Sequence, residues 1–293
     1  MADSVQSTTE VRISVVIATH NRAQSLARLL HGLAPQIVAG EHEILIADNG
    51  TAQPSPLPAD VAVSCHIHDP APGKCRVQNL AIGRATGEII VCLDDDLTAA
   101  PGYLRGVERF FGEHPEFAAM KGKVLAAEDP EKRVGARWVY MDLPIVDHGT
   151  EVCAVRGVLG ANMAFRAAAM SKVGLFDERL GPGACGHEEE TEMSSRLRAA
   201  GLRIGYCPDA VVYHEVDPAR ADPARCFRIA RERGRCRMLH ERHSRAAVLM
   251  QAAYAGLRLC LARMLRASDE RLARETRRYA TALGMLAGPH RRQ

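Results

Sequence analysis

Four short, largely apolar runs divide the first third of the chain. They occupy residues 13–18, 43–47, 61–67 and 89–93. Continuous apolar runs of this length are typical of parallel strands that are buried on both faces. Apolar residues recur at helical spacing after each turn, in the segments around residues 26–33, 74–85 and 101–113. The alternation of strand, turn and helix over residues 12–113 predicts an open, mostly parallel α/β sheet.

The remaining two thirds of the chain have a less regular pattern. Strands are expected near residues 120–126, 160–166, 203–207 and 210–213, and a helix is expected over 193–200. Clustered glycine and proline predict a loop over residues 181–186. The final part, from residue 223 to about 288, is expected to form helices rich in arginine.

These patterns predict one α/β domain followed by a helical extension. The α/β domain is expected over residues 12–218, with a first half at 12–113 and a second half at 114–218. A disordered N-terminus is expected over 1–11, the helical extension over 219–288 and a short tail over 289–293.

Composition and charge limit the classes of function. The net charge is only +3 among 293 residues, so nothing requires a nucleic acid partner and none is expected. Nine cysteines at irregular spacing, with no C-x-x-C, argue against a disulfide scaffold or a cysteine-rich zinc site and favour a reducing cytoplasm. Residues 65–68, Cys-His-Ile-His, are interpreted as a strand rather than a metal cluster. The absence of a signal peptide and of a long apolar stretch predicts a cytoplasmic protein without a membrane span.

Polar clusters follow three of the predicted strands. They are Thr19-His20-Asn21-Arg22, Asp48-Asn49 and Asp94-Asp95-Asp96. Ligands of open α/β sheets bind beyond the carboxyl ends of the strands, so all three clusters are expected in one crevice.

The aspartate triplet is the first candidate for chemistry. Adjacent carboxylates repel one another unless a cation neutralises them. In an extended conformation Asp94 and Asp96 would point to the same side, where their oxygens suit Mg²⁺ or Mn²⁺ bridging a diphosphate. The alternative is an acidic turn that caps the helix near Pro101.

Three further groups carry weaker signals. Glu188, Glu189, Glu190 and Glu192 follow the glycine-rich loop, where a carboxylate fits the role of general base; the alternative is a helix start with a Glu192–Arg196 pair. His214 ends a short apolar run and is either a structural histidine or a ligand for Mn²⁺. Lys74, Arg76 and Asn79 open a predicted helix, where they either bind diphosphate or form a solvated basic face.

The order of these motifs resembles the family 2 glycosyltransferases of GT-A fold, over roughly residues 12–215. The resemblance rests on the strand that leads into Thr19-His20-Asn21-Arg22, on Asp48-Asn49-Gly50, Asn79 and Leu93-Asp94-Asp95-Asp96, and on the segments 189–197 and 208–214. It implies a Rossmann-like, mixed nucleotide-binding sheet flanked by helices, with the helical extension following it. In such a domain residues 12–113 would be the nucleotide-binding half and residues 114–218 the acceptor-binding half.

The resemblance also implies roles for individual residues. The nucleotide-sugar site would contain Thr19, Asn21, Arg22, Asp48, Asn49, Lys74, Arg76, Asn79, Asp94 and Asp95. Asp96 and His214 would bind Mn²⁺ or Mg²⁺. The base would be Glu190, which stands where the family usually has aspartate, and Glu189 and Glu188 remain alternatives.

The implied reaction is a single displacement with inversion at the anomeric carbon. The donor would be a nucleotide sugar, usually a UDP-sugar, and the acceptor a hydroxyl or amine on a small molecule, a carrier-bound intermediate or a glycan precursor. Rival interpretations are a nucleotidyltransferase or sugar-nucleotide pyrophosphorylase, a non-catalytic nucleotide-sugar-binding protein and, more remotely, a glycosidase.

The helical extension lies outside the resemblance. The apolar residues between 248 and 265 are expected to pack over the acceptor site. The alternatives are pairing with a second subunit to form a homodimer, and peripheral contact with an anionic membrane surface. The many arginines between 228 and 245 are also compatible with docking an acidic partner.

Overall fold

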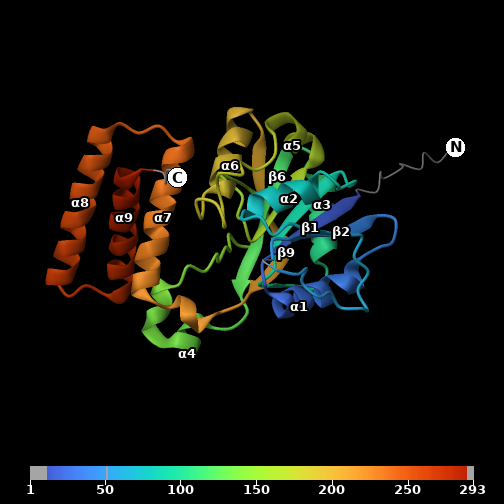
Figure 1. Cartoon of the computed structure of the whole chain (residues 1–293), viewed down its shortest axis with the longest axis horizontal. Helices are drawn as coiled ribbons and strands as arrows, with labels where there is room; N and C mark the ends of the chain where they lie inside the picture. The colour runs from blue at the N-terminus through green and yellow to red at the C-terminus, as the bar shows by residue number, and fades with distance from the viewer. Residues whose placement is uncertain (1–11, 51, 289–293) are drawn as a thin grey trace.

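The computed structural model describes residues 12–50 and 52–288. The N-terminus expected over 1–11 and the tail expected over 289–293 lie outside the described residues. The described residues form one nine-stranded mixed sheet with flanking helices, followed by a layer of three helices (Figure 1). The strand order is β3-β2-β1-β4-β8-β6-β9-β5, and β7 pairs with β9.

The first half of the sheet is parallel. It contains β1 (Ile13–Thr19), β2 (His42–Asp48), β3 (Cys65–His68) and β4 (Ile89–Asp94). The apolar side chains of β1, β2 and β4 are buried on both faces, which confirms the prediction from their continuous apolar runs. The strand expected over 61–67 begins only at residue 65, and its side chains are half-buried because β3 lies at the edge of the sheet.

The second half of the sheet mixes parallel and antiparallel strands. It contains β5 (Leu97–Ala99), β6 (Phe117–Ala126), β7 (Cys153–Val155), β8 (Asn162–Arg166) and β9 (Arg203–His214). The prediction of separate strands over 203–207 and 210–213 is wrong, because β9 is continuous. The pairing of β9 with β6 shifts register around residues 208–210, so an irregularity absorbs Pro208 without ending the strand.

Helices cover both faces of the sheet. One face carries α1 (Ala23–Leu33) and α3 (Tyr103–Glu113), and the other carries α2 (Lys74–Ile82), α5 (Ala167–Val173) and α6 (Glu189–Ala199). The leucines of α1 and the aromatic stripe of α3 are buried against the sheet, as their helical spacing predicts. The helix expected to start at Met193 begins four residues earlier, at Glu189.

Four short elements of the described residues lie among the longer strands and helices. They are the helix α4 (Pro130–Val134) and three 3₁₀ turns over Ala34–Gln36, Gly135–Tyr140 and Pro218–Arg220. The extension itself consists of α7 (Pro223–His240), α8 (Arg245–Met264) and α9 (Asp269–Ala287). Figure 1 shows these three helices side by side, with α9 in the middle and α8 outermost. Asp222, Ser244 and Ser268 cap them, because each side chain accepts a backbone N–H of the first turn.

The extension is fastened to the sheet domain at several points. Buried Glu188, just before α6, pairs with Arg237 and His240 of α7. A disulfide joins Cys185 to Cys236 of α7, although the irregular cysteine spacing argues against a disulfide scaffold. No helix of the described residues is long and apolar enough to cross a membrane.

Candidate active site

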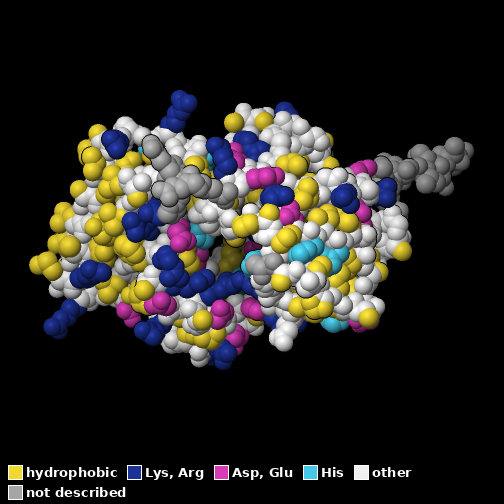
Figure 2. All heavy atoms as spheres, in the orientation of Figure 1, with side chains coloured by type: hydrophobic (Ala, Val, Ile, Leu, Met, Phe, Trp, Pro, Cys, Tyr) yellow, Lys and Arg dark blue, Asp and Glu magenta, His cyan; other side chains and the backbone are white. Residues whose placement is uncertain are grey.

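A cavity of about 650 Å³ opens between the carboxyl edge of the parallel strands and the extension. In Figure 2 this hollow lies between the two parts of the molecule, with Lys and Arg side chains along its rim. Its lining includes most of the residues singled out from the sequence: Thr19, Arg22, Asn49, Lys74, Asp94, Asp95, Asp96, Glu189, Glu190 and His214. The strand register explains the convergence, because Thr19 pairs with Asp48 across β1 and β2 while Ala18 pairs with Asp94 across β1 and β4.

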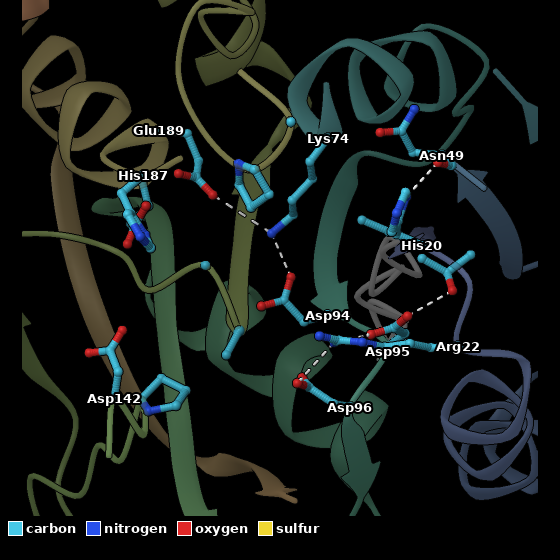
Figure 3. A pocket seen from close by; sticks show the side chains of 18 of the residues that line it. His20, Arg22, Asn49, Lys74, Asp94, Asp95, Asp96, Asp142, His187 and Glu189 are labelled. Atoms are coloured by element: carbon cyan, nitrogen blue, oxygen red, sulfur yellow. Dashed lines mark hydrogen bonds and ion pairs between the residues drawn. The ribbon is translucent and has the colours of Figure 1, made fainter. Parts of the chain in front are cut away.

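The three aspartates have different partners. The alternation of an extended strand stops at Asp94, because the chain bends at residues 95 and 96, and all three side chains reach the cavity. Asp94 pairs with Lys74, while Arg22 Nη1 lies 3.0 Å from Asp95 Oδ1 and 3.1 Å from Asp96 Oδ2 (Figure 3). Burial raises the pKa of Asp95, although the Thr19 hydroxyl donates to it at 2.7 Å.

Asp96 and His214 form the candidate metal-binding pair. The pairing of β5 with β9 sets Leu97 opposite His214, which brings His214 Nε2 to 3.3 Å from Asp96 Oδ1. Both side chains are buried. Burial raises the pKa of Asp96, but the hydrogen bond to His214 and the charges of His214, Arg220 and Arg22 outweigh it, so the net shift is downward.

The donor set of this pair fits a divalent cation. Nδ1 of His214 lies 2.7 Å from the Glu215 carbonyl oxygen, so this nitrogen donates and Nε2 faces the carboxylate. A backbone carbonyl that fixes the imidazole in this way is the usual support of a metal-binding histidine. A separate cluster of Glu41, His42 and Glu108 also gathers ligand atoms, but it lies at the amino end of β2, away from the cavity.

Lys74 links the two acidic sides of the cavity. Its side chain extends from the start of α2, with Nζ 2.5 Å from Asp94 Oδ1 and 3.8 Å from Glu189 Oε1 (Figure 3). Burial lowers the pKa of Lys74, but the charges of Asp94 and Glu189 outweigh it and the net shift is upward. The lysine therefore stays charged, paired with Asp94 and close to the buried carboxyl group of Glu189.

The glutamate cluster divides into three environments. Glu188 does not line the cavity, because its carboxylate faces Arg237 and His240 of α7. Glu189 is 5% exposed, and burial followed by the charge of Glu190 raises its pKa to about 8. Glu190 is half-buried and lines the cavity opposite Gly160. Glu192 pairs with Arg196 four residues on, as the spacing predicts.

Besides Glu188 and Glu192, four residues singled out from the sequence lie outside the cavity lining. Asp48 is fully buried and accepts backbone N–H groups of Gly50 and Ser55. Asn79 exchanges two hydrogen bonds with the backbone of Phe176. The half-exposed side chain of Arg76 forms an ion pair with Asp69. Asn21 has a left-handed backbone conformation, with φ 55°. Their roles in binding stay predictions, but the contacts of Asp48 and Asn79 hold loops in place.

Several cavity residues were not singled out from the sequence. The extension and its approach supply Arg220 and Arg225, and the irregular segment before β7 supplies Asp142. Arg233, one of the arginines between 228 and 245 considered for docking an acidic partner, lines the same wall. Arg220 Nη2 lies 2.8 Å from Asp96 Oδ2, and Arg233 Nη2 lies 2.8 Å from Asp142 Oδ2. His187 joins this wall, and burial followed by the charge of Arg233 lowers its pKa to about 4. No sequence signal separates these arginines from their many neighbours.

Comparison with known proteins adds a family and a fold. A family model described as glycosyl transferase family 2 matches residues 14–173, more than half of the chain. A pre-mycofactocin glycosyltransferase of Mycobacterium tuberculosis (strain ATCC 25618 / H37Rv) is 28% identical over 215 residues, which are 69% of this chain and 42% of that protein. A glucosyl-dolichyl phosphate glucuronosyltransferase of Haloferax volcanii is 21% identical over 226 residues, 72% of each chain. The chain thus spans less than half the length of the first of these relatives.

Two solved structures have a similar fold. GalNAc-T7 with UDP, GalNAc and Mn²⁺ has a TM-score of 0.54 at 14% identity, covering 76% of this chain and 48% of its own. The mannosyltransferase PcManGT from Pyrobaculum calidifontis, in complex with GDP-Man and Mn²⁺, has a TM-score of 0.51 at 17% identity, covering 96% and 74%. The GT-A fold with a helical C-terminal region, expected from the sequence, is confirmed.

Proposed function

The chain belongs to glycosyl transferase family 2, and from that premise we propose that it is a metal-dependent, inverting glycosyltransferase. The proposed donor is a nucleotide sugar, in the first instance a UDP-sugar, and the proposed acceptor is a hydroxyl or amine. The observation that carries this proposal is the cavity in which Asp94, Asp95 and Asp96 face Glu189 and Glu190. One side holds a donor-type acidic site, and the other holds candidate bases.

The donor side supports binding of a nucleoside diphosphate and a metal. Asp96 and His214 would hold Mn²⁺ or Mg²⁺, which would neutralise the departing diphosphate. Two proteins of similar fold were solved with Mn²⁺: GalNAc-T7 together with UDP, and PcManGT together with GDP-Man. Arg22, Arg220 and Lys74 add fixed positive charge at the same wall, and fixed charge stabilises a leaving group without reorganisation.

The acceptor side favours Glu190 as the general base. Glu189 is buried, lies beside Lys74 and has a raised pKa, so it is partly protonated near neutral pH and suits a positioning role toward Lys74. Glu190 is more exposed and faces the cavity near Gly160. We therefore assign Glu190 to removal of the acceptor proton as the acceptor oxygen or nitrogen attacks the anomeric carbon from the face opposite the diphosphate.

The acceptor belongs to one of three proposed classes: a small molecule, a carrier-bound intermediate or a glycan precursor. The names of the two relatives include a pre-mycofactocin acceptor and a dolichyl phosphate-linked sugar, so relatives of this chain act on chemically distinct acceptors. The cavity wall formed by Arg225, Ile229 and Arg233 of α7 is where acceptor selection is expected, because the aspartates lie on the sheet side of the cavity.

A thermal-shift screen of nucleoside diphosphates with and without Mn²⁺ tests the donor side. A ligand that binds the folded state raises its stability by mass action. We expect UDP to raise the melting temperature more with Mn²⁺ than without it, and Asp96→Asn to remove the metal-dependent part. Asp209→Asn, which changes an exposed aspartate outside the cavity, is the matched control. A complete lack of metal-dependent shifts with every nucleoside diphosphate would contradict the proposal.

Hydrolysis of nucleotide sugars tests the base. Glu190→Gln should keep the metal-dependent shift with UDP but lower turnover by about 10²-fold or more, the usual contribution of a general base. Glu189→Gln should affect nucleotide binding as well, through Lys74. Unchanged turnover in Glu190→Gln would overturn the base assignment. A wild-type protein that binds nucleotide and metal but turns over no nucleotide sugar would be a non-catalytic binding protein.

A further inference from the structure

The helix α8 packs on only one side. Its buried residues, Val248, Ala252, Ala255, Leu259 and Ala262, face α9, and in Figure 1 no helix or strand of the described residues lies beyond α8 on its other side. Most of these buried residues are small, so α8 lies close to α9 without using its larger apolar side chains. Those side chains lie on the opposite face of the helix.

That opposite face is an exposed apolar stripe, here called the outer face of α8. Met264 is 78% exposed, Met250 68% and Tyr254 62%. The complete set is Leu249, Met250, Tyr254, Leu257, Leu261, Met264 and Leu265. These seven are half of the large hydrophobic residues exposed in the described part of the chain, and Figure 2 shows hydrophobic side chains gathered over α8. Soluble monomers rarely expose a contiguous apolar patch of this kind without a partner.

The charged side chains of α8 itself have a single sign. No aspartate or glutamate occurs between residues 242 and 268. Arg242 and Arg245 lie at the amino end of α8, and Arg263 and Arg266 lie at its carboxyl end; all four are exposed. None of the four forms an ion pair with a described residue, in contrast to Arg258, which is held by buried Glu275 of α9. The outer face is therefore an apolar stripe with a cationic group at each end.

This charge pattern decides between two occupants. In a symmetric pairing of two copies through α8, an antiparallel arrangement brings Arg245 of one copy close to Arg263 and Arg266 of the other, and a parallel arrangement brings identical ends together. α8 itself supplies no carboxylate in either arrangement, so its arginines meet like charges in both cases; the nearest acidic residues, Glu241, Asp269 and Glu270, lie beyond the ends of the helix. An anionic lipid surface instead accepts the apolar side chains at the level of the acyl chains and the guanidinium groups at the headgroup phosphates.

We propose that the outer face of α8 binds reversibly to the surface of an anionic lipid bilayer, with the helix lying in the plane of the interface. The attachment is peripheral, since no described helix is long and apolar enough to cross a membrane. The inference does not depend on the proposed glycosyltransferase activity. It gives a role to a helix that contributes no residue to the lining of the cavity.

Cosedimentation of the full chain with lipid vesicles tests the apolar stripe. The two probes are vesicles of phosphatidylcholine alone and vesicles of equal parts phosphatidylcholine and phosphatidylglycerol. We expect binding to the mixed vesicles, with at least about tenfold weaker binding for the double variant Leu257→Glu, Met264→Glu, because two charged groups would enter the apolar layer. Val38→Glu is the matched control, since Val38 is a similarly exposed apolar residue in a distant loop. Circular dichroism of each variant checks that the exposed substitutions leave the fold intact.

The arginines and the rival occupant need separate measurements. Arg263→Gln with Arg266→Gln should reduce the preference for phosphatidylglycerol and the salt sensitivity of binding. The proposal fails if the wild-type chain does not bind the mixed vesicles, or if the glutamate double variant binds as well as the wild type. A second copy of the chain is the occupant instead if two results occur together. In light scattering without lipid, the wild type is then a dimer and the glutamate double variant is not, and neither protein binds vesicles.

Discussion

At the scale of single residues, the cavity depends on a balance between buried carboxylates and a few fixed cations. Lys74 is the clearest case, because one ammonium group serves Asp94 on the donor side and Glu189 on the other side. Its side chain is only 15% exposed, so water screens these interactions poorly. Removing the lysine would leave the Asp94 carboxylate without its ion-pair partner and the buried Glu189 side chain without its nearby positive charge.

We predict that Lys74→Met lowers the free energy of unfolding at neutral pH by about 3 kcal/mol, the usual cost of breaking a buried ion pair by removing one partner. Denaturant unfolding measures this difference. Arg109→Ala is the control, because Arg109 and Asp209 form an ion pair with both side chains 53% exposed, for which a change below about 1 kcal/mol is expected. If the two substitutions lower the free energy of unfolding equally, the buried ion pair of Lys74 contributes no more to stability than an exposed one.

The sequence predicts part of this residue-level arrangement. Asp94–Asp96, Glu189, Glu190 and His214 follow strand or loop ends in a recognisable order, and all of them line the cavity. Asp48 and Asn79 fit the same motif order, but their side chains form hydrogen bonds with the backbone of Ser55 and Phe176. The sequence pattern does not predict these hydrogen bonds. Arg220 reaches Asp96 from 124 positions away, so only the folded chain can select it among so many arginines.

His187 provides a pH-dependent signature of the cavity wall. Its pKa is lowered from 6.5 to about 4, first by burial and then by the charge of Arg233, so the folded state keeps the imidazole neutral where the unfolded state binds a proton. The contribution of this residue to stability is therefore present above about pH 6.5 and is lost as the pH falls toward 4.

We predict that His187→Gln flattens the fall in stability between pH 6.5 and about 4, by up to about 3 kcal/mol relative to the wild type, since each unit of pKa shift corresponds to about 1.4 kcal/mol. Unfolding measured across this pH range for both proteins gives the difference directly and cancels the titration of other groups. A difference that is independent of pH would contradict a neutral, buried His187.

At the scale of elements, periodicity predicts the central strands and the long helices but not the close contacts between them. Continuous apolar runs identify β1, β2 and β4 because these strands are buried on both faces. Strands of three residues, such as β5 and β7, are too short to show any period. The sequence pattern also does not predict where α7 and α9 cross. At that crossing Gly234 of α7 and Gly284 of α9 allow the two backbones to come close together.

We predict that Gly234→Ala separates α7 from α9 and destabilises the protein by about 1–3 kcal/mol, the usual cost of overpacking. A Cβ at Gly234 would lie 2.0 Å from the Thr281 carbonyl oxygen, which is backbone and cannot move aside alone. Gly112→Ala in α3 is the matched control, because a Cβ there meets nothing within 4 Å and a helical alanine should be neutral or stabilising. Thermal unfolding compares the two, and a neutral Gly234→Ala would show that the helices are packed more loosely.

At the scale of the whole molecule, the extension completes the cavity rather than standing apart from it. Arg225, Ile229 and Arg233 of α7 form one wall, and the sheet domain forms the other. The position of that wall is fixed by the contacts of Glu188 with α7 and by the disulfide between Cys185 and Cys236. The disulfide closes a loop of 51 positions that contains α6 and β9, so it constrains both halves of the site at once.

The disulfide therefore yields a prediction that separates an oxidised from a reduced molecule. Cys185→Ser should lower the stability of the protein purified without reductant by about 3–4 kcal/mol, because a cross-link over a loop of this length restricts the unfolded chain. Reductant should lower the wild type toward the variant and leave the variant unchanged. Cys153→Ser, at an exposed free cysteine, is the matched control and should change little.

Thiol titration of the denatured, non-reduced wild type should find seven free cysteines rather than all nine. If titration finds nine free thiols and reductant does not change unfolding, the disulfide prediction is wrong and the cysteines are reduced, as their irregular spacing predicts. The ion pairs of Glu188 with Arg237 and His240 would then be the main contact that holds α7 against the sheet domain.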